Sequence, residues 1–530
     1  MIPFHTKRVH LHPLCTFLLT KPLLACYTEC IIIGKREHAM KRFLALLLVL
    51  ATMISVLVAC AEGGQGQTDE TVNAETGEPA QLDNIPADLK FDGEDVTIIS
   101  RAYLGWTWDE VAVPELNSEP VNDAIFNRNI QVGDRLNINI VSHPIEEVDQ
   151  AKPIAEVEKA VLAGSDEYDL LAGACYLVLQ SSLEGTFRDM TGLEYLDLTQ
   201  NYWTQDYNEV ISYNGKQYSA TGMIALSTYR FAFVTMFNKV DFDDKQVPYL
   251  YEAVNNGEWT LDFQAALAED FYQDLNGNGK KDEGDFFGLI TAPYISTDPY
   301  WASCDLPLVE KNADGEYEYV VDTARLSNVA DKVLKLFYES GTLVYPHTAA
   351  DAEQDDIRIA FARGDGAMCT TRLVAAEMGD IRNMEDAYGI VPMPKYDQAQ
   401  PKYGTLQHDQ FTVYAIPVTV KDDRYQMLGA VLEVMASESL RTVKPAYYEI
   451  ALKRKYMSDP VAWDMLDLIF NTVNIDAGIV YTNALGNPHD AFRQIITGKK
   501  NTVSSRYKKL EKTVIKNLAK MEKKLDELEE

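Results

Sequence analysis

The stretch from residue 96 to residue 172 alternates β-rich segments with amphipathic helical segments, and this alternation constrains the fold more than any other feature of the chain. The expected elements are a strand at 96–100, a helix at 120–136, a strand at 137–141, a helix at 151–163 and a strand at 168–172. In the first helix, Val121, Ile125, Val132 and Leu136 share one face. Strands that are joined through helices pair in parallel. The pattern therefore predicts an α/β fold.

The rest of the chain continues this mixture of strands and helices. The expected elements are a long β-rich run at 228–240 that crosses between lobes, helices near 259–271 and 325–339, a helix, turn and strand over 356–370, strands or crossings at 388–394 and 409–418, and helices from about residue 424 onward. The last helix, about 503–528, has apolar residues at three- or four-residue steps. This stripe is expected to pack on the body of the protein, with a partner helix as the alternative.

The charge balance is strongly acidic, since 48 Lys and Arg face 80 Asp and Glu, a net charge of −32. Nucleic acids and anionic membrane surfaces are polyanions, so this balance argues against both as partners. It fits a soluble exported protein with a neutral or cationic ligand. Seven cysteines in 530 residues are too few for a disulfide scaffold.

Residues 40–60 have the pattern of a secretion signal. Lys41 and Arg42 precede an apolar run over 43–59, and Leu57-Val58-Ala59-Cys60 resembles the lipobox of bacterial lipoproteins. The expected outcome is cleavage before Cys60 and lipidation of its sulfur, which would place the protein on the extracellular face of the cell membrane. The alternative is a transmembrane anchor, because the run approaches the ~18–20 residues that span a bilayer.

The segments on either side of this signal carry no expected domain. Residues 1–39 are interpreted as an upstream mis-start, with translation beginning at Met40. Residues 61–90 are rich in Gly, Gln, Thr, Asp and Glu, and such a composition predicts a flexible tether.

The sharpest local motif is a calcium-loop pattern at 274–285, DLNGNGKKDEGD. The expected ligands are Asp274, Asn276, Asn278, the backbone carbonyl of Lys280, Asp282 and Asp285. Calcium prefers six to eight hard oxygens, and this spacing curls oxygen-bearing side chains around one point. The last position is Asp285 rather than the usual Glu, which shortens the chelating arm. The alternative is an acidic surface turn that holds no ion.

Aromatic residues beside strand ends and crossings are the candidate ligand-binding residues. Ligands of open α/β sheets lie outside the carboxyl ends of the strands, and aromatic rings match the apolar face of a sugar. Tyr103, Trp106 and Trp108 follow the first expected strand directly. The further candidates, chosen by their place next to a strand end or crossing, are Tyr176, Tyr229, Trp301, Arg372, His408 and Asp409.

Catalytic motifs are mostly missing from the sequence. It contains no H-E-x-x-H, no G-x-x-x-x-G-K-[ST], no G-x-G-x-x-G and no C-x-x-C pattern. Cys175, Cys304 and Cys369 lie in apolar or small-residue surroundings, so they are expected to be buried rather than nucleophilic. No catalytic residue and no organic cofactor is predicted.

The chain resembles extracellular solute-binding proteins of family 1, the lipoprotein receptors of carbohydrate-type ABC importers. The segments that carry the resemblance are LVAC, TYRFAFVTMFNKV, GEWTLDFQAA, FARGDGAMCTTRL, YGIVPMPKYDQ and HDQFTVYAIPVTV, in this order over nearly all of 91–500. Each segment is moderately specific alone, and their order and spacing add specificity.

The resemblance implies a periplasmic-binding-protein-like fold of type II, with two lobes, a hinge and an interlobe cleft. The implied amino-terminal lobe is 91–230 plus 366–410, and the carboxyl-terminal lobe is 231–365 plus 411–530. Matching the family motif puts Arg372 at the cleft wall and His408 and Asp409 at the last crossing. The family's sugar-binding tryptophans in the second lobe have no clear match, and Trp301 is the nearest candidate.

The implied function is a monomeric receptor that binds a sugar by hinge closure and delivers it to the permease subunits of an importer. Two alternatives stay open, a secreted carbohydrate-active hydrolase and a ligand sensor for a membrane kinase.

Overall fold

The computed structural model describes residues 82–102, 106–282, 284–346, 350–456 and 459–528. Gln81–Glu530 form one compact unit. The predicted signal peptide, the predicted lipidation site Cys60 and most of the predicted tether lie outside the described residues, as does Tyr103.

The first lobe is built on a four-stranded sheet with the order β12-β3-β1-β2. Its strands are β1 (Glu94–Arg101), β2 (Ile138–Ile145), β3 (Leu170–Ala174) and β12 (Thr412–Ala415). β1 pairs in parallel with β2 and β3, whereas β12 runs antiparallel to β3. The helices that accompany this sheet are α2 (Pro120–Leu136), α3 (Lys152–Leu162), α4 (Cys175–Ser182), α5 (Gln205–Ile211) and α14 (Asp422–Glu438).

The second lobe is built on a five-stranded sheet with the order β10-β4-β9-β5-β8. Its strands are β4 (Phe233–Asn238), β5 (Leu289–Thr291), β8 (Thr342–Val344), β9 (Met368–Arg372) and β10 (Tyr388–Pro392). β5 pairs in parallel with β8 and β9, whereas β4 runs antiparallel to β9 and β10. Its larger helices are α9 (Leu261–Phe271), α11 (Thr323–Tyr338), α12 (Ala350–Arg363), α15 (Pro460–Asn471), α18 (Asp490–Thr497) and α19 (Val503–Glu527).

Short elements complete the unit. They are α6 (Ser227–Arg230), α7 (Lys239–Lys245), α8 (Leu250–Asn255), η1 (Ile295–Thr297), α10 (Pro299–Ser303), β6 (Val309–Lys311), β7 (Tyr317–Tyr319), η2 (Leu373–Glu377), α13 (Gly379–Arg382), β11 (Thr405–Leu406), β13 (Val473–Asn474), α16 (Ala477–Val480) and α17 (Thr482–Leu485). A wide-turned π-helical stretch, η3 (Ser439–Val443) and η4 (Ala446–Tyr456), follows α14.

The inner strands β1 and β3 of the first sheet are buried on both faces over most of their length, whereas the edge strand β2 is partly exposed. Ile98 and Leu170 point into a core shared with α2 and α14, while the next residues, Ile99 and Leu171, point into the core that continues into the second lobe. α2 begins with Pro120 at its first turn, where the missing N–H costs no hydrogen bond. Its predicted apolar face is buried.

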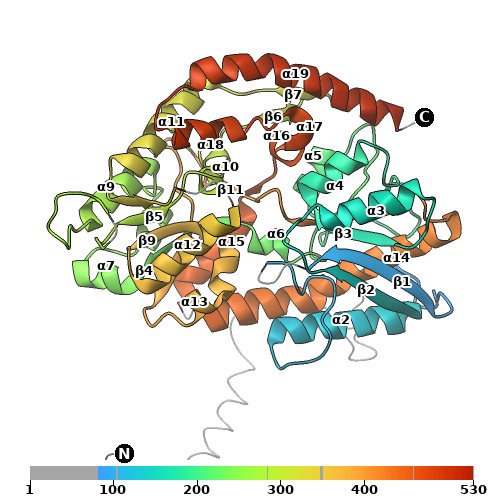
Figure 1. Ribbon diagram of the computed structural model, residues 1–530. Helices are drawn as coiled ribbons and strands as arrows, with labels where there is room; N and C mark the ends of the chain where they lie inside the picture. The colour runs from blue at the N-terminus through green and yellow to red at the C-terminus, as the bar shows by residue number, and fades with distance from the viewer. Residues whose placement is uncertain (1–81, 103–105, 283, 347–349, 457–458, 529–530) are drawn as a thin grey trace, which may run out of the picture. The chain divides into compact units, whose positions relative to one another are not determined.

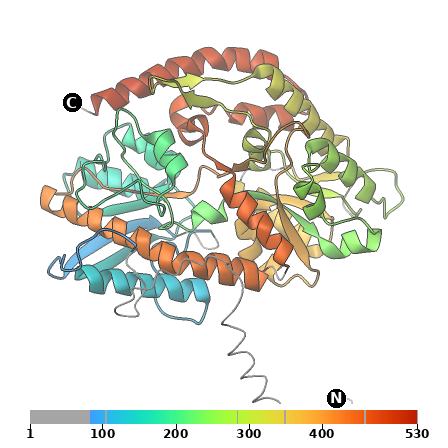
Figure 2. The same cartoon turned by 180° about the vertical axis from the view of Figure 1, so that it is seen from behind.

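The chain crosses between the lobes near α6, at 406–411 and through the π-helical stretch. Two of these crossings lie side by side, since Ala232 and Gln407 form an antiparallel bridge and the His408 N–H donates to the Phe231 carbonyl. Each lobe therefore receives an antiparallel strand directly after a crossing, β4 in the second lobe and β12 in the first. Figure 2 shows α14 and its π-helical continuation, η3 and η4, running along one side of the unit from the first lobe towards the second.

The predicted lobe boundaries are wrong in the second half of the chain. β9 and β10 were expected in the amino-terminal lobe as part of 366–410, but both pair with β4 in the second sheet. β12 and α14 were expected in the carboxyl-terminal lobe as part of 411–530, but β12 pairs with β3 in the first sheet. The physical reason is that strand pairing between distant segments, not local sequence, decides the lobe to which a segment belongs.

The predicted β-rich run at 228–240 is only partly a strand. α6 occupies its start, β4 its middle and α7 begins at Lys239, where the Asn238 side chain accepts the Val240 N–H as a helix cap. The last helix is confirmed as packed on the body. α19 buries Tyr507, Val514, Leu518, Met521 and Leu525, and Figures 1 and 2 show it at the outer edge of the unit.

Candidate functional site between the lobes

The carboxyl ends of parallel strands from both sheets bring polar side chains together between the lobes. Arg101 ends β1, Tyr176 follows β3, Tyr294 follows β5 and Arg372 ends β9. This is the position at which ligands bind to open α/β sheets. We call the following group the interlobe cluster: Arg101, Trp106, Tyr176, Tyr294, Asp298, Arg372, His408, Asp409 and Arg493.

Trp106 and Arg372 form the aromatic part of the interlobe cluster. The guanidinium carbon of Arg372 lies 4.1 Å from the centre of the Trp106 ring and 5.0 Å from that of Phe231. Trp106 meets Phe231 edge to face at 6.3 Å. Stacking on an aromatic face suits the planar guanidinium and holds it in one orientation. Arg372 also donates from Nη1 to Gln410 Oε1 at 3.3 Å.

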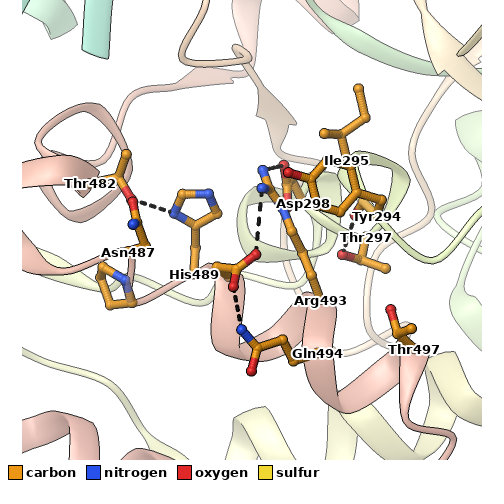
Figure 3. A network of polar contacts seen from close by, with 12 residues as sticks. Tyr294, Ile295, Thr297, Asp298, Thr482, Asn487, His489, Arg493, Gln494 and Thr497 are labelled. Carbon is orange, nitrogen blue, oxygen red and sulfur yellow. Dashed lines mark hydrogen bonds and ion pairs between the residues drawn. The ribbon is translucent and has the colours of Figure 1, made fainter. Parts of the chain in front are cut away.

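Asp298, Arg493, His408 and Asp409 form its ionisable part. Arg493 donates from Nε and Nη2 to the two carboxylate oxygens of Asp298 at 2.8 and 2.5 Å, as Figure 3 shows. His408 Nε2 lies 3.5 Å from Asp409 Oδ1 and 3.9 Å from Asp298 Oδ2. The guanidinium of Arg493 also lies over the Tyr294 ring at 4.7 Å.

Burial dominates the protonation of these groups. It raises the pKa of Asp409 to about 7; Arg493 opposes this shift and Asp298 adds to it. Burial lowers the pKa of His408 well below its usual value, and the neighbouring Arg372 and Arg493 lower it further. His408 is therefore neutral at physiological pH, while Asp409 titrates there. Burial raises the pKa of Tyr176 to about 12, and the negative charge of nearby Asp409 contributes to the same increase.

Two buried nitrogen atoms of the interlobe cluster have no hydrogen-bond partner among the described residues. These are Arg101 Nε and His408 Nδ1, on side chains that are buried. A buried polar atom without a partner costs free energy. The cluster therefore holds hydrogen-bonding capacity that a polar ligand between the lobes can use.

Five of the nine predicted ligand-binding residues meet in the interlobe cluster: Trp106, Tyr176, Arg372, His408 and Asp409. Trp108 does not join them. Its side chain is 40% exposed and lines a separate hollow with Val111 and Pro144. Trp301 is 2% exposed and packs against Phe492 and Tyr507. Trp301 packs within the second lobe and also lines another pocket, of about 340 Å³, together with Lys311 and Tyr317.

Tyr229 lines a different interlobe pocket of about 590 Å³. Its ring meets Phe470 edge on at 4.7 Å, and Gln407 lines the same pocket. His408, the next residue along, contacts the interlobe cluster instead, because neighbouring side chains of an extended segment point to opposite faces. The crossing thus separates this pocket from the cluster.

Sequence reasoning missed four members of the cluster: Arg101, Tyr294, Asp298 and Arg493. Arg101 directly follows the strand expected at 96–100, so the rule that selected Trp106 could have found it, whereas no strand was expected at 289–291, before Tyr294. Asp298 lies at the start of α10, and Arg493 on α18, and nothing local distinguishes them from other acids and arginines. Asp298 is 3% exposed, and only the fold reveals this burial.

A second buried ion network lies beside the crossing at α6. Arg230 donates from Nη2 to Asp109 Oδ2 and to Glu377 Oε2, each at 2.9 Å, and its side chain is 3% exposed. The Tyr447 hydroxyl donates to Glu377 Oε1 at 2.9 Å. These contacts join the loop after β1, the α6 crossing, η2 and η4, so we call them the hinge clamp.

The predicted calcium loop forms an acidic turn held by its own hydrogen bonds. The Asp274 carboxylate accepts the Gly277 and Gly279 N–H groups at 2.6 and 2.8 Å. Asp285 accepts the Tyr272 hydroxyl at 2.9 Å. The side-chain nitrogens of Asn276 and Asn278 donate to Asp282 at 2.8 Å. The loop thus gathers oxygen atoms, and calcium binding would require both amide groups to turn away from Asp282.

Among the described residues, no group of three or more His, Cys, Asp or Glu is arranged to hold a metal ion, and no helix is long and apolar enough to span a membrane. Cys175, Cys304 and Cys369 are free and buried, as predicted. Burial raises the pKa of the Cys304 thiol to about 12, which removes thiolate reactivity.

Comparisons with solved structures identify the class of fold. A sugar transporter protein from Rhizobium etli in an open conformation is 16% identical, with a TM-score of 0.52, covering 79% of this chain and 99% of its own. A solute-binding protein from Thermotoga lettingae bound to α-D-tagatose is 14% identical, with a TM-score of 0.51 and coverage of 80% and 100%. Maltose-bound MalE3 of T. maritima is 13% identical, with a TM-score of 0.50 and coverage of 82% and 100%.

The chain therefore has the two-lobed periplasmic-binding-protein-like fold that its resemblance implied. One of these neighbours is an ABC transporter solute-binding protein bound to tagatose and another is bound to maltose, and at 13–16% identity the likeness shows the fold alone. No protein-family model and no curated protein sequence matches the chain.

Proposed function

We propose that this protein is an extracellular receptor that binds a sugar between its lobes and delivers it to the permease subunits of an ABC importer. The observation that carries the proposal is the interlobe cluster. Its side chains come from both lobes, several of them from the carboxyl ends of strands, so a ligand bound there bridges the lobes. Closing the lobes completes the ligand's hydrogen bonds in a dry site. Anchoring through a lipid on Cys60, and action as a monomer, are parts of the same proposal.

A sugar fits the chemistry of the interlobe cluster. Trp106, Tyr176 and Tyr294 supply flat rings, and Arg101 Nε supplies a donor without a partner among the described residues. Asp409 supplies acceptor oxygens for hydroxyl groups. This combination of aromatic faces with a few fixed polar groups is typical of small-molecule sites.

A panel of saccharides tests the proposal by thermal melting. The panel includes tagatose, maltose and maltotetraose, and at least one saccharide is expected to raise the melting temperature by several degrees, because a ligand at about 100 times its Kd adds ~2.7 kcal/mol of stability. The same mixtures are then examined by chromatography. Recovery of the intact saccharide supports a receptor, and hydrolysis products would instead support the hydrolase. A shift from peptides alone would contradict the sugar assignment.

We propose in addition that the 274–285 loop binds calcium weakly, with a Kd of ~10⁻⁴–10⁻³ M. Asp274, Asn276, Asn278, Asp282, Asp285 and the carbonyl of Lys280 would hold the ion. The support is the curled loop, in which carboxylate and amide oxygens lie along one short turn. Its role would be structural, because calcium would relieve repulsion between the carboxylates.

Calorimetric titration with calcium measures this directly. Asp274→Ala and Asp282→Ala are each expected to abolish heat release, since each removes a ligand. Asp314→Ala is the matched control, because it removes one exposed acid from the turn between β6 and β7. The proposal would be contradicted if the unmodified protein takes up no calcium. It would also be contradicted if the control variant loses as much of the heat of calcium binding as the loop variants do.

A further inference from the structure

The outward side of α19 carries a row of lysines in a protein whose net charge is −32. We call it the lysine stripe, and its members, all exposed, are Lys508, Lys509, Lys512, Lys516, Lys520 and Lys523. At about 100° per residue these lysines fall within an arc of about 120°. Val514 and Leu518 lie on the opposite, buried side. The stripe is therefore one continuous surface.

The charge of the lysine stripe is hardly compensated. Lys523 pairs with Glu527 at 3.0 Å, and the other five lysines make no ion pair with any residue that the structure describes. Other acids of α19 do not pair with these lysines: Glu522 accepts the Tyr317 N–H at 2.7 Å, Asp526 accepts from Asn214 at 3.2 Å, and the exposed Glu511 makes no ion pair with a described residue. Five cationic groups thus remain available to an external partner.

The geometry of the lysine stripe favours a flat partner. The 25 residues of α19 extend over about 37 Å, and Figures 1 and 2 show the helix along the outer edge of the unit. Lysine is a mobile point charge without the planar fork by which arginine recognises single phosphates. The apolar side of α19 is buried against the body, so the helix cannot insert into a bilayer. Such a row suits a diffuse anionic surface.

We propose that the lysine stripe docks this protein on an anionic phospholipid membrane. Clusters of four to eight basic residues on a helix attract anionic lipids. The acidic body does not cancel this attraction, because charges are screened beyond ~8 Å at physiological ionic strength. A membrane in contact with α19 therefore interacts electrostatically with the lysines of the stripe, and the acidic residues on other parts of the protein are screened from it. Docking orients the lobes against the surface, and it does not depend on the sugar proposal.

Vesicle sedimentation tests this inference with the chain from Ala61 onward, which lacks the lipid-bearing Cys60 and retains the compact unit Gln81–Glu530. Vesicles of phosphatidylcholine with 30% phosphatidylglycerol should bind the protein in 0.1 M salt, and pure phosphatidylcholine vesicles should bind it at least tenfold less. Raising the salt to 0.5 M should abolish the difference, because the attraction is electrostatic.

A pair of matched variants locates the interaction. The quadruple change Lys508→Gln, Lys512→Gln, Lys516→Gln and Lys520→Gln should lower the partition coefficient at least tenfold. Four exposed lysines elsewhere, Lys90, Lys159, Lys280 and Lys402, are changed to Gln as a control with the same loss of charge. The proposal would be overturned if the partition coefficient falls equally in both variants, or if the unmodified protein binds vesicles with and without phosphatidylglycerol equally. Melting curves of both variants verify that they are folded.

Discussion

Replacing Trp106 by alanine should weaken sugar binding at least tenfold, whereas Trp108→Ala should change it by less than about twofold. Trp106 lies at the interlobe cluster and stacks on Arg372, while Trp108 lines another hollow. Losing the ring also frees the guanidinium that it orients, and such contacts contribute ~0.5–2 kcal/mol each. The two tryptophans are two residues apart, so each is the other's control. Calorimetry with the saccharide that shifts melting most gives the two Kd values.

Arg372→Lys separates the role of the planar guanidinium from that of charge. Lysine keeps the positive charge but loses the stacked plane and the fork of donors. We expect a loss of ~1.5–3 kcal/mol, or roughly 10- to 150-fold in Kd, if Arg372 donates to the ligand. Binding that survives both Trp106→Ala and Arg372→Lys would place the sugar elsewhere, with the pocket beside Tyr229 as the next candidate.

Arg230→Ala should lower the free energy of unfolding by about 3–5 kcal/mol. The change leaves Asp109 buried, and Glu377 mostly buried, without their cation, and an uncompensated buried charge has a cost of this size. Arg363→Ala is the control, because Arg363 pairs with Asp365 at a surface where its side chain is 61% exposed. Such exposed pairs contribute less than about 1 kcal/mol. Urea unfolding followed by fluorescence measures both changes.

The hinge clamp gives this prediction a second consequence. Arg230 joins elements of both lobes at a crossing, so its loss should also increase the range of lobe opening. Small-angle scattering without sugar should show a larger radius of gyration for Arg230→Ala than for Arg363→Ala. If neither stability nor radius changes, the hinge clamp has no mechanical role.

Local patterns in the sequence predicted individual elements well. The helix expected at 120–136 is α2, Pro120–Leu136, and the helix expected at 151–163 is α3, Lys152–Leu162. Both have an apolar stripe of helical period together with a proline in the first turn, so the information lies within one helix. The burial of Cys175, Cys304 and Cys369 also followed from their immediate neighbours.

Local sequence patterns could not show to which lobe a segment belongs. Phe233 pairs with Arg372, and Thr412 with Ala174. Backbone pairing between such distant residues leaves no periodic trace in either segment, which explains why β9, β10 and β12 were assigned to the wrong lobes. The resemblance supplied the correct fold class but not its boundaries.

The candidate site was likewise only partly predictable from the sequence. The five predicted residues that meet in the interlobe cluster each adjoin a strand end or a crossing: Trp106, Tyr176, Arg372, His408 and Asp409. Asp298 and Arg493 lie on short or late helices, and only packing makes them an ion pair with oxygen–nitrogen distances of 2.8 and 2.5 Å. Trp301 met the sequence criterion equally well, yet tertiary packing placed its ring against Phe492.

The lysine stripe shows most clearly the difference between what the sequence determines and what only the tertiary structure decides. Composition alone gave a net charge of −32 and argued against anionic surfaces, but a net charge does not say where the charged residues lie. The sequence by itself determined the α/β class, most helices and the residues at strand ends, because these depend on neighbours along the chain. The tertiary structure alone decided which strands share a sheet, which charges meet between the lobes and which face of α19 stays in solvent, because these depend on contacts between distant residues.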